Sequence, residues 1–151
     1  MQARINYREV APDAFRALLG FHGYVRKTGL GDAFLDLLCT YVSLLNGCAH
    51  CIDMHSRDAR GRGETEQRIY ALTVWRETPF FSERERAAFG YAEAVTKLAN
   101  GVSDEVFDEV RKHFSDKEVV ELTVAIADIN AWNRVGIAMR IVPGTTAKAG
   151  T

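Results

Sequence analysis

The sequence predicts a single all-α domain, and three observations lead to that prediction. Apolar residues recur at helical spacing through almost the whole chain, whereas no segment alternates apolar and polar residues as a half-buried strand does. Glycine, proline and serine residues divide the periodic stretches into lengths typical of globular helices. With 151 residues, 47% of them hydrophobic, the chain can form one core without a second domain.

Four helices are predicted in the first half of the chain. They are expected at 12–28, 32–45, 48–61 and 64–75. Pro12 suits the first turn of the first helix, and the spacing of its apolar residues places Leu19 and Tyr24 inward. Gly47 separates the second helix from the third, so two cysteines open the third helix.

Three further helices are predicted in the second half, at 82–98, 103–113 and 116–141. Ser82 and Glu85 have the spacing of a capping box, which marks the start of the first of them. The last helix is the most apolar and carries more than one buried stripe, so it is either central or also meets another subunit. Pro143 and Gly144 end it, and 145–151 is expected to be a loose tail.

Charge and composition exclude several classes of function. The 19 basic and 20 acidic residues leave a formal charge of -1, so neither nucleic acid nor an anionic membrane is an expected partner. The N-terminus lacks the apolar stretch of a signal peptide, and no apolar run approaches the length that spans a bilayer. Three cysteines are too few, and odd in number, for a disulfide-built secreted scaffold. We therefore expect a cytoplasmic protein.

The segment from Asn46 to His55 carries two thiols and an imidazole at helical spacing. Cys48 and Cys51 are three residues apart on one helix face, so they can close a disulfide ring. A first-turn position for Cys48 would lower the pKa of its thiol from about 8.5, because helix N-termini favour a thiolate. His55, one turn beyond Cys51, can accept the proton of Cys51. The helix dipole favours a thiolate at Cys48, whereas His55 favours one at Cys51. The spacing therefore leaves open which cysteine attacks.

Two neighbouring residues complete this patch. Asp36 faces inward on the preceding helix and is the nearest candidate for the group that sets the tautomer of His55. Cys39, one turn beyond Asp36, is interpreted as a small buried hydrophobic side chain.

Two other interpretations of the cysteine pair stay open from spacing alone. The pair is either buried without any chemistry, or it binds zinc. The zinc ligands would be Cys48, Cys51 and His55, with His50, His22 or Cys39 as the fourth. The sequence has no second Cys-x-x-Cys and no His-x-x-x-His to supply a distant ligand pair. We therefore predict no metal and no cofactor.

Six segments together resemble a known family. They are Ser43-x-x-Asn46-Gly47-Cys48-Ala49-x-Cys51-Ile52-Asp53-Met54-His55, Asp58-Ala59-Arg60, Gly63-Glu64-Thr65-Glu66-Gln67-Arg68, Trp75-Arg76-Glu77-Thr78-Pro79, Ser82-Glu83-Arg84-Glu85-Arg86-Ala87-Ala88 and Asn130-Ala131-Trp132-Asn133-Arg134. The chain resembles the carboxymuconolactone decarboxylase superfamily, specifically its AhpD-like alkylhydroperoxidase branch. The resemblance covers most of 30–144, which we expect to be the core of one domain spanning 1–151.

The resemblance implies a fold, an assembly and a reaction. It implies about seven helices, with the cysteine pair at the start of the third, and a homo-trimer or homo-hexamer. It implies that Cys51 attacks a hydroperoxide and becomes a sulfenic acid, which Cys48 resolves into a disulfide. His55 and Asp36 would relay protons, and a thiol or dithiol protein would reduce the disulfide.

The sequence departs from the branch at three positions. Asp36 stands where the branch usually has glutamate, and Tyr41 and Leu44 stand where it tends to carry arginine and glutamine. Tyr41 and Leu44, in place of arginine and glutamine, predict a less polar approach to the cysteines. The decarboxylases of the superfamily lack the cysteine pair, so lactone decarboxylation is not expected here.

The leading hypothesis is therefore thiol-dependent reduction of organic hydroperoxides. One alternative is a disulfide reductase that passes electrons to a partner protein. The other is a non-enzymatic oligomeric domain whose cysteines form a redox sensor or a zinc site.

Overall fold

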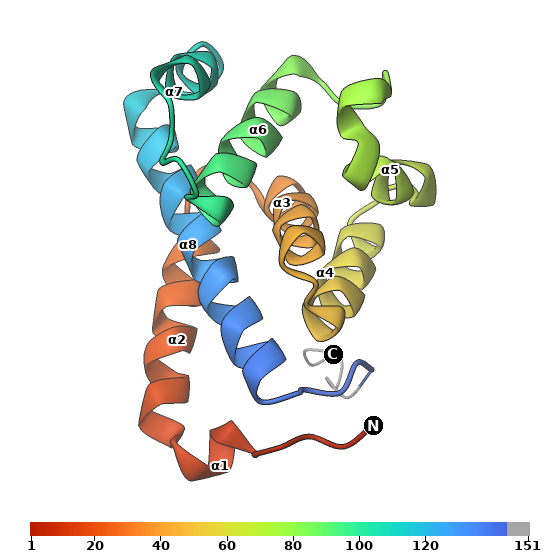
Figure 1. The fold of residues 1–151 in the computed structure, drawn as a ribbon, viewed down its shortest axis with the longest axis vertical. Coiled ribbons are helices and arrows are strands. Elements are labelled where there is room, and N and C mark those ends of the chain that lie inside the picture. The colour runs from red at the N-terminus through yellow and green to blue at the C-terminus, as the bar shows by residue number, and fades with distance from the viewer. Residues whose placement is uncertain (145–151) are drawn as a thin grey trace.

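The computed structural model describes residues 1–144, and its regular elements are all helical (Figure 1). They are α1 (Tyr7–Val10), α2 (Pro12–Val25), α3 (Asp32–Asn46), α4 (Ala49–Gly61), α5 (Glu66–Ala71), the 3-10 helix η1 (Leu72–Glu77), α6 (Glu83–Lys97), α7 (Asp104–Arg111) and α8 (Asp116–Ala138). The all-α prediction is confirmed. None of these helices combines the length and the apolar character needed to cross a bilayer.

The predicted elements differ from the observed ones in several places, and α2 for example ends at Val25 instead of 28. The single-turn helix α1 was not predicted, because four residues are too short to show apolar periodicity, and the cysteine helix is therefore the fourth. The stretch 64–75 divides into α5 and η1, with a non-helical backbone at Val74. The long helix ends at Ala138 instead of 141. The predicted tail at 145–151 lies outside the described residues.

Helix α3 lies at the centre of the molecule and packs against α4, α6 and α8. The core is formed by fully buried aliphatic and aromatic side chains from three helices, among them Leu35, Leu38, Val42, Phe89, Leu122, Ile126 and Ile129. Burying each such side chain stabilises the fold by about 1.5–3 kcal/mol. The helices that carry the site are therefore anchored on a rigid central element.

Two helices begin with the capping boxes expected from local sequence. The amide of Glu85 donates to Ser82 Oγ, and the side chain of Glu85 accepts from the amide of Ser82. Ser115 and Glu118 make the same reciprocal pair at the start of α8. Each box satisfies two backbone amides that have no partner inside the helix.

Helix α2 packs along α8 (Figure 1), and much of its apolar surface is exposed. Among its residues, Val25 is buried, whereas Leu19 is 44% exposed and Tyr24 is 52% exposed. The inward placement predicted for Leu19 and Tyr24 is therefore wrong. Only one side of α2 is covered by the rest of the chain. The apolar spacing correctly indicates an apolar helix face, but part of that face is not buried within this chain.

Candidate active site

A tight turn delivers the cysteines to the start of α4. Gly47 ends α3 in the left-handed region, with φ of 69°, a conformation that a side chain would disfavour. The amide of Cys48 then donates to the carbonyl of Ser43 at 3.0 Å. As a result α4 begins immediately after α3 and packs against it.

Asparagine side chains fix this turn to α8. Asn46 Nδ2 donates to Asn130 Oδ1 at 2.9 Å and to Asn133 Oδ1 at 2.8 Å. Asn133, which is fully buried, donates through Nδ2 to Ser43 Oγ at 3.0 Å. The polar residues that flank the cysteines in sequence therefore hold the turn in place, since buried amides need all their partners.

Cys48 and Cys51 form a disulfide, with their Cα atoms 5.4 Å apart. Cys48 is the N-cap residue of α4, so Cys51, and not Cys48, occupies the first helical turn. An N-cap side chain also lies close to the free amides of the first turn, so the helix N-terminus favours a thiolate at both sulfurs, whereas His55 favours one at Cys51.

The two sulfurs face different surroundings. A cavity of about 330 Å³ between α2, α4 and α8 is lined by Cys51 and His55, and Cys48 does not line it. Instead, Cys48 packs beneath Gly136 of α8, where an added Cβ would lie 3.0 Å from Cys48 Sγ and 3.4 Å from Cys51 Sγ. Two groups of side chains form the rest of the cavity wall. The apolar and aromatic ones are Tyr7, Phe15, Leu19, Met54, Trp132 and Ile141, and the polar and charged ones are Arg8, His22, Arg26, His50 and Asp58.

Asp36 is buried beside His55 and is held by two arginines. Its Oδ1 lies 2.6 Å from Arg26 and its Oδ2 lies 2.7 Å from Arg62. His55 Nδ1 is 3.9 Å from Asp36 Oδ1, which is an electrostatic contact and too long for a direct hydrogen bond. Burial raises the pKa of Asp36, but His55 and the two guanidiniums outweigh it and leave that pKa lowered. Asp36 is therefore a carboxylate at neutral pH.

A second histidine–carboxylate pair lies near the cavity. His22 Nδ1 is 2.7 Å from Oδ2 of the buried Asp128, and Arg26 Nε donates to His22 Nε2 at 3.3 Å. Arg26 thus links this pair to Asp36. Sequence reasoning did not find Arg26, Arg62 or Asp128, because the two residues of the His22 pair are 106 positions apart and no local motif joins them.

The zinc set considered from the sequence is not brought together. Among residues 1–144, the histidine, cysteine and acidic groups close enough to share a metal ion are Asp36, His55 and Asp58. This group contains no cysteine, and Asp36 already pairs with two arginines. Cys39 is a free buried thiol, and burial, the largest cause, raises its pKa to about 12. That thiol stays protonated and unreactive at neutral pH.

Tyr41 does not line the cysteine cavity, contrary to the expectation that it makes the approach less polar. Its hydroxyl accepts a hydrogen bond from Trp75 Nε1 at 2.9 Å, and its ring packs on Phe89. The residue at this position therefore belongs to the core between α3, η1 and α6, where Trp75 also packs on Phe89.

Comparisons with known proteins agree with this architecture. The sequence profile of the carboxymuconolactone decarboxylase family matches residues 12–94. The uncharacterized protein YdfG of Bacillus subtilis is 41% identical over 92% of this chain and 95% of its own length. A solved structure of a protein of unknown function from Agrobacterium tumefaciens, suggested to be the antioxidant defence protein AhpD, has a TM-score of 0.92. It is 42% identical, over 96% of this chain and all of that chain.

Two further similarities concern named activities. The alkyl hydroperoxide reductase AhpD of Caulobacter vibrioides is 50% identical over 36 residues, which are 24% of this chain and 20% of that protein. The debrominase Bmp8 has a TM-score of 0.79 at 24% identity, over 89% of this chain and 73% of its own. At that identity the likeness concerns the fold alone, and the same fold therefore serves more than one activity.

Proposed function

The chain belongs to the carboxymuconolactone decarboxylase family, and from that premise we propose that it is a thiol-dependent organic hydroperoxidase of the AhpD type. The observation that carries the proposal is the asymmetry of the cysteine pair. Cys51 lines a cavity together with His55, whereas Cys48 is covered by Gly136. A peroxide entering the cavity meets the sulfur of Cys51 first.

In the first step the neutral imidazole of His55 takes the proton of Cys51 in the reduced protein. The thiolate attacks one peroxide oxygen, so that a sulfur–oxygen bond forms and the oxygen–oxygen bond breaks. The leaving alkoxide takes the proton from His55 and departs as an alcohol, and Cys51 is left as a sulfenic acid.

In the second step the sulfur of Cys48 attacks the sulfenic acid and displaces water. The disulfide seen in the structure is the product of that step. An external thiol or dithiol protein would return the pair to the reduced state. A reducing compartment keeps such reductants available, so we propose that the reaction takes place in the cytoplasm.

Asp36 has a narrower role in this proposal than proton relay. Two guanidiniums and a lowered pKa keep it ionised, so it is a poor proton acceptor. Its negative charge, 3.9 Å from the ring, instead stabilises His55 while the ring carries the proton of Cys51. Asp36 is thus a positioning and electrostatic residue.

The test is a thiol count on the reduced protein before and after one equivalent of cumene hydroperoxide. We expect rapid loss of two of the three thiols. Cys39→Ser should also lose two thiols, because Cys39 does not take part in the reaction. Cys51→Ser should react at background rate, because the remaining thiols do not line the cavity.

Cys48→Ser identifies the attacking sulfur. It should consume one equivalent of peroxide and accumulate a sulfenic acid that dimedone traps, since no resolving thiol is present. Retained peroxide consumption in Cys51→Ser, together with loss in Cys48→Ser, would reverse the assignment. Slow reaction with peroxide but fast reaction with a model disulfide would favour the disulfide reductase.

A further inference from the structure

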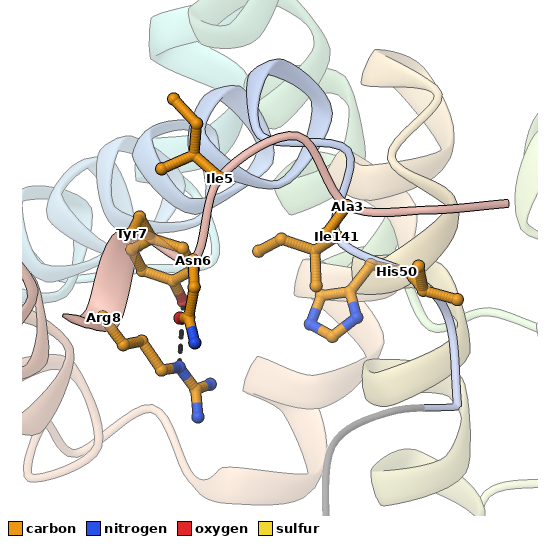
Figure 2. A pocket seen from close by; sticks show the side chains of 8 residues that line it. Ala3, Ile5, Asn6, Tyr7, Arg8, His50 and Ile141 are labelled. Carbon is orange, nitrogen blue, oxygen red and sulfur yellow. Dashed lines mark hydrogen bonds between the residues drawn. The ribbon is translucent and has the colours of Figure 1, made fainter. Parts of the chain in front are cut away.

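A second cavity of about 350 Å³ adjoins the one that holds Cys51. It lies between the segment preceding α1 and the start of α4, and Figure 2 shows the side chains that line it. Tyr7, Arg8, His50 and Ile141 line both cavities. A ligand with its reactive end at Cys51 can therefore reach this second space, which we call the N-terminal cavity.

The N-terminal cavity is apolar apart from a few groups, and its single charged side chain is basic. Ile5 and Ile141 contribute apolar surface, Asn6 contributes an amide, and Arg8 and His50 enter from opposite sides (Figure 2). No acidic residue lines it within the part of the chain that the structure describes. Burial, assisted by the nearby charge of Arg8, lowers the pKa of His50, so the imidazole is neutral at neutral pH.

The charge of Arg8 is not neutralised by a carboxylate among residues 1–144. Its guanidinium lies 4.9 Å from the ring centroid of Phe15, and its Nε donates to the Tyr7 hydroxyl at 3.3 Å. These aromatic contacts hold the side chain on the side of the cavity opposite His50 and leave its remaining N–H groups for a ligand. Arg26, the other arginine in the cysteine cavity, differs because it pairs with Asp36 and Asp32.

The acidic residue of the cysteine cavity lies away from Arg8. Asp58 places its carboxylate within 4.8 Å of ligand atoms of Asp36 and His55. His50 precedes Cys51 on α4, while Asp58 follows it by almost two turns. Asp58 thus lies toward the end of α4, beside Asp36 and His55, whereas His50, which lines the N-terminal cavity together with Arg8, lies at the start of α4.

We propose that Arg8 and Asn6 form a subsite for a carboxylate, so that the substrate is an organic hydroperoxide with an apolar body and an anionic substituent. This inference rests on the proposed function. The peroxide group would lie at Cys51, the apolar body against the aromatic wall, and the carboxylate at Arg8. The combined volume suits a compact aromatic or short aliphatic acid, because ligand pockets generally range from about 300 to 1,000 Å³.

The test compares two substrates that differ only in charge: cumene hydroperoxide and its 4-carboxylate derivative, with dithiothreitol as the reductant. We expect kcat/KM about fivefold higher for the carboxylate in the wild-type protein, a typical effect for one partly exposed ion pair. Raising the salt concentration should reduce this preference, because the pair is screened.

Arg8→Gln should abolish the preference, measured as the ratio of the two kcat/KM values within that variant. The matched control is Arg16→Gln on α2, whose arginine is exposed, pairs with Asp13 and does not line either cavity. That control should keep the fivefold preference.

Equal reduction of both substrates by the wild type would overturn the carboxylate subsite and leave the hydroperoxidase function intact. If neither hydroperoxide is reduced, the proposed function fails. The subsite is then tested separately, by comparing the binding affinities of the two alcohols that correspond to these hydroperoxides. Tighter calorimetric binding of the carboxylated alcohol, lost in Arg8→Gln, would support the subsite, and equal binding would overturn it.

Discussion

At the scale of single residues, the surroundings of Asp36 decide what its carboxylate can do. Arg26 and Arg62 each contact one of its two oxygens. The aspartate side chain, which is shorter than a glutamate, therefore pairs with both arginines and does not make a direct hydrogen bond to His55. We therefore propose that an aspartate at this position, where the related branch usually has glutamate, acts through its charge, and this proposal leads to a prediction about pH.

Asp36→Asn should lower the free energy of unfolding by about 2 kcal/mol at neutral pH, because two guanidiniums lose their buried counter-charge. The loss is smaller than for a fully buried pair, since Arg62 is half exposed. The pKa of Asp36 is lowered in the folded protein, so its contribution is present above its ordinary pKa of about 4 and disappears as the pH falls through the lowered value. Urea unfolding from about pH 7 down to pH 2 should show wild type and variant converging in acid.

The same variant should reduce kcat/KM for cumene hydroperoxide about tenfold and change the pH–rate profile. Asp32→Asn is the matched control, because Asp32 contacts the same two arginines from an exposed position. It should leave the profile unchanged. A profile in Asp36→Asn that matches the wild type would remove Asp36 from the reaction.

At the scale of elements, α8 packs on the start of α4 so that Gly136 lies against the sulfurs of both buried cysteines, and of the two only Cys51 also lines the cavity. Gly136 makes this possible, because any larger residue would contact Cys48 Sγ closely. The restriction on this helical glycine is steric, since its backbone is not in the left-handed region.

Gly136→Ala should lower the free energy of unfolding of the disulfide form by about 1–3 kcal/mol, because the added Cβ overpacks against both sulfurs. The reduced form should lose less, since free thiol side chains can rotate away. Denaturant unfolding of both redox forms measures this difference.

Gly90→Ala on α6 is the control for helix propensity. An added Cβ there meets the Trp75 ring at an ordinary 3.9 Å, so this variant should be stabilised by about 0.5–1 kcal/mol. Equal stabilisation of Gly136→Ala would mean that the α8 contact does not constrain the cysteine pair.

At the scale of the whole molecule, the exposed apolar residues of α2 indicate an interface. Phe21 is 36% exposed and Tyr24 is 52% exposed, and Ile137 on the adjacent α8 is 47% exposed. Exposed apolar side chains that lie near one another, as Phe21 and Tyr24 do one helical turn apart, commonly mark a contact between proteins. The homo-trimer or homo-hexamer implied by the sequence resemblance would cover it.

Sedimentation velocity should therefore detect a trimer or a hexamer for the wild type. Replacing both Phe21 and Tyr24 by glutamate should shift the protein toward monomer, because burying two unpaired carboxylates is costly. Tyr70→Glu, at an exposed position on α5, should leave the assembly unchanged. A monomeric wild type would contradict the prediction.

Features that depend on neighbours in the chain could be predicted from the sequence. The helices, the capping boxes at Ser82 and Ser115 and the spacing of Cys48, Cys51 and His55 are all of this kind. Local periodicity fails where an element is short, as in α1, or where its apolar face is not covered by the same chain, as in α2.

The sequence by itself determined the fold class, the family resemblance and the presence of a thiol pair one turn from a histidine, because helical geometry relates residues three or four positions apart. Only the tertiary structure decided that Cys51 faces the cavity, that Arg26 and Arg62 hold Asp36, and that Arg8 and His50 line the N-terminal cavity together. These contacts join different helices, and periodicity specifies the face of a helix but not the helix that packs against it.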